Sequence, residues 1–447
     1  MINKLKKNYG LLKGMFPAVG ARLTNAAKAM NEVVKERLGL WSSAGEEGLT
    51  AKVTLEVEKV MRWMLETQKS KGVVIPEKTR WKFSLDAREV GGQQQVMVGV
   101  TPMDLDLPVN SCFSVLPLAL YVGDESNEGF HDQVAPLAEE MEALEDNGII
   151  FSHNCSTRPE FVMSADLKSC WAIYGFGGVF AQEQCPYCSI QRKERHRYGA
   201  CTSITRTLAD FPKAVVSIPP QKFLFCSLHM LLRVVDYLWL KLVTVIRANS
   251  RTRKRNLKKL EEILVRHGLK FKYYEFEDAN GNKQWEVGSF TGKQCRKLLE
   301  YAATEICSLD SSEDGRSGLT YDCWSKFWTL WKRLNDTEDH VGFHVAAQDW
   351  GRCMFDRYGE RSFRIYVHLL IDHGEDLMKR FGALGIYSNQ AFENEHKRER
   401  IIYYRRTSHD GGKVGHNRML AMEQILNIVY RQNFAKFSPV EYEEIVE

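Results

Sequence analysis

The stretch that decides the fold is WKFSLD, residues 81–86, in which apolar and polar side chains alternate. Such alternation predicts a half-buried β-strand, because successive side chains of a strand point to opposite faces. Gly91 and Gly92 indicate a turn, and QVMVGV, residues 95–100, predicts a second strand. A sheet is therefore expected to begin near residue 81.

Three more strands and three helices follow this pair. The third strand, residues 112–122, is more continuously apolar than the first two. Further strands are expected at 161–166 and 222–226, and helices at 129–145, at 171–180 and from His229 onward. The order is strand, strand, strand, helix, strand, helix, strand. It is similar to the order of an RNase H-like fold, a mixed sheet with helices on both faces.

The composition is that of a folded protein with reduced cysteines. The chain has 447 residues and a formal net charge of +4, and its apolar and charged fractions are ordinary for globular domains. Eleven irregularly spaced cysteines argue against an extracellular disulfide framework. The most apolar run, residues 223–246, contains four charged or titratable residues and predicts a buried helix. An intracellular location without membrane contact is expected.

Two aspartates end predicted strands that this topology makes neighbours. Asp86 ends the first strand and Asp166 ends the fourth, so their carboxylates are expected to face each other. Paired carboxylates provide the hard oxygen ligands that Mg²⁺ or Mn²⁺ prefers. Two such ions can promote phosphodiester chemistry. Either aspartate taken alone is more simply a turn residue.

Cys185-Pro186-Tyr187-Cys188 is a CxxC motif, which is a zinc half-site or a redox pair. The surrounding sequence is not thioredoxin-like, so zinc is favoured. A complete tetrahedral site needs two more ligands. The candidate pairs are His368 with His373, spaced HxxxxH, and His196 with Cys201, which are closer in sequence.

Two basic segments are candidate phosphate-binding surfaces. Residues 247–259 include seven basic residues and no acidic one, and residues 396–406 combine basic side chains with two tyrosines. A solvated helix face is an equal alternative for the first segment and a less favoured one for the second, which follows Glu393. The DNA-contacting residues expected from these segments are Arg251, Arg253, Lys254, Arg255, Arg405 and Arg406. Trp324, Trp328 and Trp331 form a helical stripe, which is more often core than a base-stacking surface.

Taken together, the chain resembles the catalytic core of the V(D)J recombinase and its relatives, the Transib transposases. The resemblance extends over residues 81–406, and its most specific part is an ordered set of motifs. Asp166 precedes the CxxC motif by 19 residues, and SITR, residues 203–206, follows; the HxxxxH motif then precedes Glu393 by 20 residues. CFSVLPLALYVGDESNEGFHDQVAPLA, residues 112–138, is similar to the third strand and following helix of that core.

The resemblance implies specific roles for these residues. Asp86, Asp166 and Glu393 would be the carboxylates of a DDE site for two Mg²⁺ or Mn²⁺ ions, with Glu395 as the alternative third carboxylate. Cys185, Cys188, His368 and His373 would hold a structural Zn²⁺. His229, in a CxxH element, would lie beside Asp166 and orient the scissile phosphate, although a histidine satisfied at a helix start is an equal alternative.

The same resemblance implies a domain plan. The expected fold class is α/β, an RNase H-like mixed sheet interrupted by a largely helical insertion, with a structural zinc site. The expected parts are an N-terminal helical region at 1–75, the first part of the core at 76–230, the helical insertion at 231–360, a zinc-ligand and catalytic-glutamate segment at 361–420, and a C-terminal tail at 421–447.

The expected function is that of a DDE-type DNA transposase or recombinase. It would act on DNA as a homodimer, in the nucleus if the host is eukaryotic, by two-metal-ion phosphoryl transfer. One alternative is a nuclease or resolvase of the same fold that never transfers strands. A second alternative is a domesticated, zinc-stapled DNA-binding protein without activity.

Overall fold

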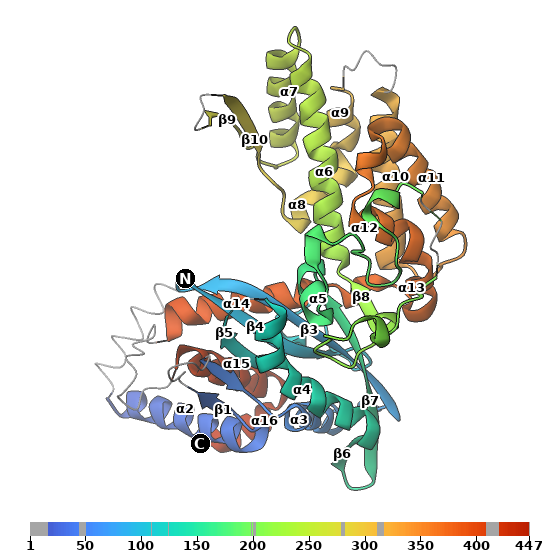
Figure 1. Cartoon of the computed structure of the whole chain (residues 1–447). Coiled ribbons are helices and arrows are strands. Elements are labelled where there is room, and N and C mark those ends of the chain that lie inside the picture. Colours follow the sequence, from blue (N-terminus) through green and yellow to red (C-terminus); the bar gives the residue numbers. More distant parts are fainter. Residues whose placement is uncertain are drawn as a thin grey trace.

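The computed structural model describes residues 17–43, 51–108, 110–123, 125–197, 199, 203–278, 282–310, 317–407 and 420–446. The chain forms an α/β structure with a mixed sheet and a helical region that follows it. Figure 1 shows the sheet and its covering helices in one part of the molecule, and the helical region, α6 to α13, extending away from it.

The centre of the sheet contains five strands in the order β5-β4-β3-β7-β8. The strands β3, β4 and β5 form an antiparallel meander, and β7 and β8 run parallel to β3. Their bounds are β3 Lys78–Val90, β4 Gln93–Pro102, β5 Leu116–Val122, β7 Cys155–Ala165 and β8 Phe223–Phe225. Three short strands complete the sheet: β1 Trp41–Ser43, β2 Lys52–Thr54 and β6 Ile149–Ser152. Strand β2 pairs with β5, β1 pairs with β2, and β6 pairs with β7.

Strand β3 is buried on both faces. Trp81, Phe83 and Leu85 are fully buried on one face, as their alternation predicts. The polar side chains of Lys82 and Ser84 on the other face are also buried, because the C-terminal helices cover this side. The half-burial predicted from alternation is therefore wrong for most of β3. Its second face is closed by chain that follows hundreds of residues later.

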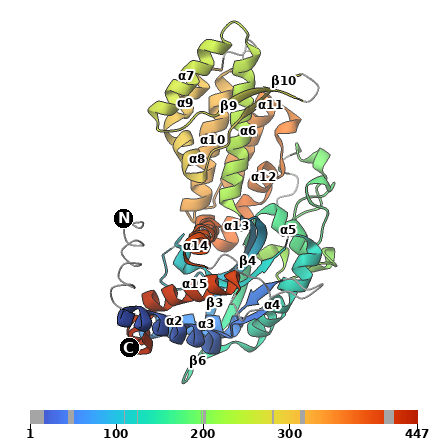
Figure 2. The same ribbon diagram turned by 90° about the vertical axis from the view of Figure 1, so that its left-hand side faces the viewer.

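Helices cover both faces of the sheet. Figure 2 shows α14 (Gln390–Arg406) and α15 (Ala421–Phe437) on one side and α4 (Asn127–Asn147) on the other. The side chain of Ser126 caps α4 by accepting a hydrogen bond from the backbone N–H of Gly129 at 3.0 Å. Helix α3 (Val57–Ser70) contacts α4, and its Trp63 packs on Phe434 of α15 with the ring centroids 4.7 Å apart.

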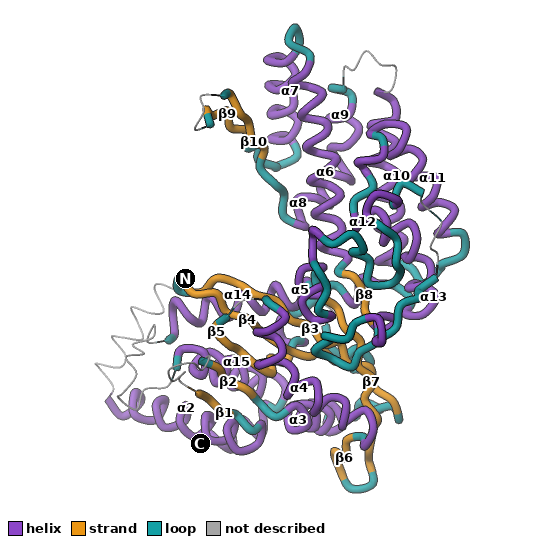
Figure 3. Tube along the Cα trace, in the orientation of Figure 1, coloured by secondary structure: helices purple, strands orange, loops and turns teal. Residues whose placement is uncertain are grey.

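The region after β8 is largely helical, as Figure 3 shows, with a small hairpin at one side. Its helices are α6 Ser227–Ala248, α7 Arg253–Arg266, α8 Gly292–Lys297, α9 Ala303–Cys307, α10 Ser317–Asp336, α11 Phe343–Tyr358, α12 Ile365–His368 and α13 Gly374–Phe381. The hairpin is β9 Tyr273–Glu277 with β10 Lys283–Val287; residues 279–281 between them lie outside the described residues. Trp324 and Trp331 of α10 are buried, as expected for core residues.

Several expectations about individual segments are wrong. Residues 1–75 were expected to be helical, yet besides α2 (Pro17–Leu38) and α3 they contain β1 and β2, which lengthen the sheet. Residues 421–447 are no tail, because buried apolar side chains of α15 pack against the sheet. The helix expected at 171–180 is α5, Leu167–Tyr174, since Gly175 ends it in a left-handed conformation. Of residues 112–122, Cys112–Ser114 form a 3₁₀ turn before β5.

Among the described helices, none combines the length and the apolar character that a membrane-spanning segment needs.

Candidate functional site

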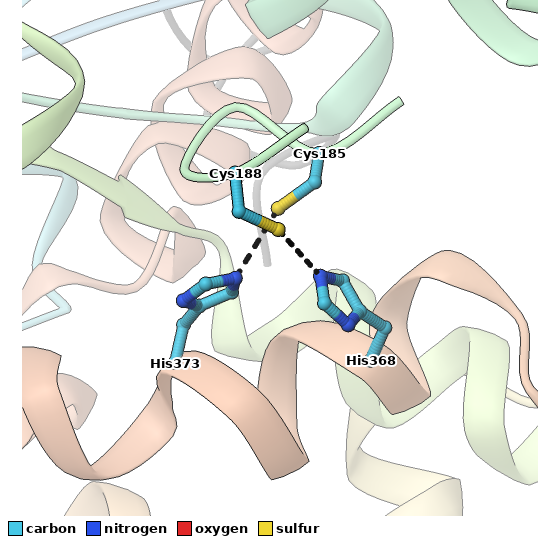
Figure 4. Close-up of side chains that lie close together, drawn as sticks. All are labelled: Cys185, Cys188, His368 and His373. Atoms are coloured by element: carbon cyan, nitrogen blue, oxygen red, sulfur yellow. Dashed lines mark hydrogen bonds between the residues drawn. The ribbon is translucent and has the colours of Figure 1, made fainter. Parts of the chain in front are cut away.

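Two cysteines and two histidines far apart in sequence converge in the interior. Cys185, Cys188, His368 and His373 are all buried, and their potential ligand atoms lie within 4.8 Å of one another. The Sγ of Cys185 is 3.4 Å from Nε2 of His373, and the Sγ of Cys188 is 3.4 Å from Nε2 of His368. Figure 4 shows the two imidazoles pointing from the helical segment toward the CxxC loop. Two thiols and two imidazoles are the donor set of a structural zinc site, so this cluster can hold a zinc-like ion.

A π turn brings the two histidines to the same side of their helix. In a regular α-helix, residues five apart lie about 140° apart around the axis, which would point the two imidazoles in different directions. Here Leu369–His373 form a single π turn, η8, between α12 and α13. Because π-type hydrogen bonds join residues five apart, His368 and His373 both face the cysteines. The HxxxxH spacing and the π turn therefore belong together.

The surroundings of the histidines suit metal binding through Nε2. The Nδ1 of His368 lies 2.9 Å from Oδ2 of Asp372, and Oδ1 of Asp372 accepts a hydrogen bond from the N–H of Gly199 at 2.7 Å. Carboxylates commonly orient zinc-bound histidines in this way. Burial lowers the pKa of His373, which favours the neutral imidazole that binds metals.

The alternative ligand pair is not part of this cluster. His196 is half-buried, and its Nε2 is 3.8 Å from a carboxylate oxygen of Glu360. Cys201 lies outside the described residues. The histidines that converge on the CxxC motif are the pair more distant in sequence.

Asp86 and Asp166 lie on neighbouring parallel segments of the chain. The last residue pair in the β3–β7 register is Phe83 with Met163, and Asp86 and Asp166 each lie three residues further along the chain. Asp166 directly follows β7 and caps α5, because its Oδ1 accepts a hydrogen bond from the N–H of Ser169 at 2.7 Å. The prediction that Asp86 ends its strand is wrong. Its strand continues for four residues because β3 pairs with β4 along its whole length.

Several charges surround Asp86. Burial, together with the neighbouring carboxylates of Asp166, Glu125 and Glu393, raises the pKa of Asp86 to about 7, while His229 opposes this shift. These four groups therefore lie close enough to Asp86 for their charges to act on it. A carboxyl group held partly protonated by other carboxylates is a group on which a cation would act favourably.

Glu125 is a residue of this cluster that sequence reasoning missed. Its Oε1 accepts hydrogen bonds from the N–H of Ala87 and the hydroxyl of Ser169, both at 3.0 Å, and its Oε2 is 2.6 Å from Nζ of Lys168. It thus links β3 to the start of α5. A signal was present, because Glu125 follows β5, and β5 ends at the same edge of the sheet as β7.

Two histidines lie beside the aspartates. His229 is in the first turn of α6. Its pKa is raised because Cys226, Asp166 and Asp86 together outweigh the opposing effect of burial. His396 of α14 was expected only as part of a basic segment, yet its Nδ1 is 3.5 Å from Oδ2 of Asp86. Burial lowers the pKa of His396 well below its usual range, so it is a neutral neighbour of Asp86.

The two candidate glutamates of α14 have different surroundings. Glu393, in the first turn, is among the charges that act on Asp86. Glu395 is fully buried, and its Oε2 is 3.2 Å from Nη1 of Arg398. Burial raises the pKa of Glu395 to about 8. Of the two, Glu393 is the one whose charge acts on Asp86.

The carboxylate cluster is more open than the cysteine–histidine cluster. Within the described part of the chain, the Cys185–Cys188–His368–His373 group is the one set of three or more potential ligands whose donor atoms approach within 4.8 Å. The oxygens of Asp86, Asp166 and Glu393 therefore do not converge to chelating distance.

The basic residues expected to contact DNA are exposed but lie on separate elements. Arg251, Arg253, Lys254 and Arg255 lie at the start of α7, at the end of the helical region remote from the sheet, as Figure 1 shows. Arg405 and Arg406 end α14, which packs on the sheet.

No protein-family model matches this chain, and no curated protein matches it either. The functional interpretation therefore depends on the residues and geometry described above.

Proposed function

We propose that this protein is a DNA-cutting and strand-joining enzyme of the DDE type, with Asp86, Asp166 and Glu393 as its metal-binding carboxylates. The observation that carries the proposal is that Asp86 on β3 and Asp166 directly after the adjacent parallel strand β7 lie close enough for the charge of Asp166 to act on Asp86, with Glu393 among the other charges acting on it. The enzyme would act on DNA as a homodimer. It would hydrolyse a phosphodiester and then use the freed 3′-hydroxyl as a nucleophile.

The topology of the sheet supports an RNase H-like assignment. Three antiparallel strands are followed by two strands parallel to the first, and the first strand lies in the centre of the five. Helices lie between β5 and β7 and between β7 and β8. This is the arrangement expected from the order of elements in the sequence, and it brings the ends of β5, β7 and β8 to one edge, where the carboxylates lie.

The donor chemistry of the cluster fits Mg²⁺ or Mn²⁺. Asp86, Asp166 and Glu393 offer the hard oxygen ligands such ions prefer, and two bound ions would supply charge stabilisation for phosphoryl transfer. Glu125 would hold β3 and α5 in register beneath them, through its bonds to Ala87 and Ser169. His229 would orient the scissile phosphate, since its raised pKa keeps it cationic beside the aspartates.

The cysteine–histidine cluster would hold Zn²⁺ as a structural ion. It joins the loop after α5 to the segment that leads into α14, and so to Glu393. Zinc would thereby close the long helical insertion and set the position of α14 relative to β3. In this role the metal acts on the geometry of the carboxylates and takes no part in the chemistry.

The test is Mn²⁺-dependent nicking of supercoiled plasmid DNA by the full chain. Nicking should be lost in Asp86→Asn, Asp166→Asn and Glu393→Gln. Glu89→Gln is the matched control, because Glu89 is an exposed carboxylate of the same strand. Joining of a labelled 3′-hydroxyl end to plasmid distinguishes a transposase from a nuclease or resolvase. Nicking that persists in all three variants would refute the assignment.

One observation favours a second candidate, a zinc-stapled DNA-binding protein without activity. The described carboxylate oxygens do not reach the mutual distances of a formed metal site. Isothermal titration with Mn²⁺ separates the two candidates. Binding that Asp86→Asn abolishes supports the enzyme. DNA binding without Mn²⁺ binding or nicking supports the inactive protein.

A further inference from the structure

A basic hollow lies between the CxxC loop and the turn before α12. It has a volume of about 730 Å³, and its two walls are residues 182–196 and 360–365. We call it the Arg195 hollow. Its positively charged lining residues are Arg192, Lys193, Arg195, Arg361 and Arg364. Against these five cations the lining contains one carboxylate, Glu360, which is 66 % exposed and lies beside His196.

The cations of the hollow are not neutralised by other acids. The nearby Glu194 is paired with Arg197, and Glu183 with Arg206. Within the described part of the chain, Arg192, Lys193 and Arg361 make no ion pair. They are exposed, so their guanidinium and ammonium groups are available to a ligand that enters the hollow.

Arg195 is the strongest sign that the ligand is an anion. It is only 3 % exposed, and its Nη2 donates a hydrogen bond to the side-chain oxygen of Gln184. Its buried Nε has no hydrogen-bond partner among the described residues. A buried cation without an acid partner is unfavourable unless an anion accompanies it. A zinc ion bound by two thiolates and two neutral imidazoles has no net charge, so the metal centre would not supply that anion.

The metal ligands lie within the first of the two segments that form the walls and shortly after the end of the second. One wall contains Cys185 and Cys188, and the other ends at Ile365, three residues before His368. An ion bound by both segments would therefore set the distance between the walls. The arginines of the two walls can act on one ligand only while that distance is kept.

The hollow also adjoins the carboxylate cluster. A second hollow of about 330 Å³ is lined by Asp166 and His229, and it shares Trp171, Arg364 and Ile365 with the Arg195 hollow. Arg364 would therefore lie between a phosphate in the Arg195 hollow and Asp166. This is a suitable place for a backbone phosphate of a strand whose neighbouring part reaches the carboxylates.

We propose that the Arg195 hollow is a phosphate-binding site whose walls the cysteine–histidine metal centre holds together. The phosphate chemistry has two possible sources, the backbone of a single nucleic-acid strand and a free phosphate such as pyrophosphate. The assignment to a strand rests on the proposed function, whereas the phosphate site does not. Guanidinium groups suit either source, because their fork matches phosphate oxygens.

The test measures binding of a fluorescein-labelled dT12 oligonucleotide to the full chain by anisotropy, over a series of NaCl concentrations and without divalent cations. The variant is Arg192→Gln with Arg361→Gln, one exposed residue from each wall, so that the fold is kept. The charge-matched control is Lys69→Gln with Lys379→Gln, two exposed lysines outside the hollow. Loss of two phosphate contacts should weaken binding roughly tenfold or more and make the slope of log K against log salt shallower by about 1.4. The control should change neither.

Two further measurements separate the sources and the role of the metal. Calorimetric titration with pyrophosphate should show one site in the wild type, which Arg195→Met abolishes. A pyrophosphate site with an unchanged dT12 slope would assign the hollow to free phosphate and refute the strand. Cys188→Ser should weaken dT12 as much as the double arginine variant does.

Unchanged dT12 and pyrophosphate binding in the arginine variants would overturn the phosphate site. Unchanged binding in folded Cys188→Ser would overturn the role of the metal. Nicking is not needed for either readout, so the hollow and the proposed enzyme can fail separately.

Discussion

Replacing Cys188 by Ser is expected to destabilise the whole fold, because it removes one ligand of the cross-link between the CxxC loop and the helical segment. Cys188 and His368 are 180 residues apart in sequence, so a metal that joins them closes a very long loop. Closing a loop of this length restricts the unfolded chain by about 5 kcal/mol at 25 °C in the chain-entropy model.

This free energy converts to a melting temperature. Unfolding entropy of about 2.1 cal/mol/K per residue gives about 0.9 kcal/mol/K over a chain of 447 residues. Loss of about 5 kcal/mol should therefore lower Tm by about 5 °C. The same decrease is expected when zinc is removed from the wild type by a chelator, and the chelator should have no further effect on the variant.

The assay combines metal analysis with differential scanning calorimetry. The wild type should hold one zinc per chain, and Cys188→Ser should hold much less. Cys307→Ser is the matched control, since Cys307 is also a buried free thiol but lies in α9, outside the metal cluster. A wild type without zinc, or a Tm of Cys188→Ser no lower than that of Cys307→Ser, would refute the reasoning.

Four further predictions concern the carboxylates, a buried lysine and the basic segment before and within α7. Asp86→Asn should reduce Mn²⁺-dependent nicking about a thousandfold, because several kcal/mol of charge stabilisation depend on the metal ligands. Glu89→Gln should leave the nicking rate unchanged, and equal rates in the two variants would exclude Asp86 as a metal ligand. Because burial raises the pKa of Asp86 to about 7, protons compete with the metal below that pH. The Mn²⁺ affinity measured by calorimetry should therefore increase from pH 6 to 7 and level off above pH 7, and an affinity independent of pH would contradict this. Burial lowers the pKa of Lys82 from 10.5 to about 8, so between these pH values the unfolded chain binds more protons than the folded chain. As the pH rises through this range, the free energy of unfolding of the wild type should increase by about 3 kcal/mol relative to that of Lys82→Met. Urea denaturation at each pH measures both free energies, and an equal pH dependence of the two proteins would disprove the prediction. Arg251→Gln with Arg253→Gln should weaken the binding of unrelated DNA duplexes equally, as measured by anisotropy, and make the slope of log K against log salt shallower by about 1.8. A loss of affinity confined to one DNA sequence would indicate base contacts instead.

The sequence was most informative where local chemistry acts alone. Alternation over residues 81–86, the turn at Gly91 and Gly92, and the buried run after residue 223 depend on side-chain periodicity, which is local. These signals were enough to predict the central strands and the long helix after them. They failed near residues 41–54, because β1 and β2 are strands of three residues that exist through pairing with each other and of β2 with β5.

The metal cluster shows the same division. The CxxC motif can be read from residues 185–188, and thiols at that spacing predict half of a zinc site. The choice between the nearby pair of His196 and Cys201 and the distant pair of His368 and His373 could not be made from spacing. It depends on the π turn that brings two histidines five residues apart to one side, and on the packing of that turn against the CxxC loop.

For the carboxylates, the sequence by itself predicted that Asp86 and Asp166 face each other, because both were expected to end neighbouring strands. Only the tertiary structure decided which further groups reach them. Glu125 lies in the loop after β5, and on α14 the charge of Glu393 acts on Asp86 whereas Glu395 pairs with Arg398. These contacts join residues up to several hundred positions apart. Their energies come from packing and burial, which no local pattern records.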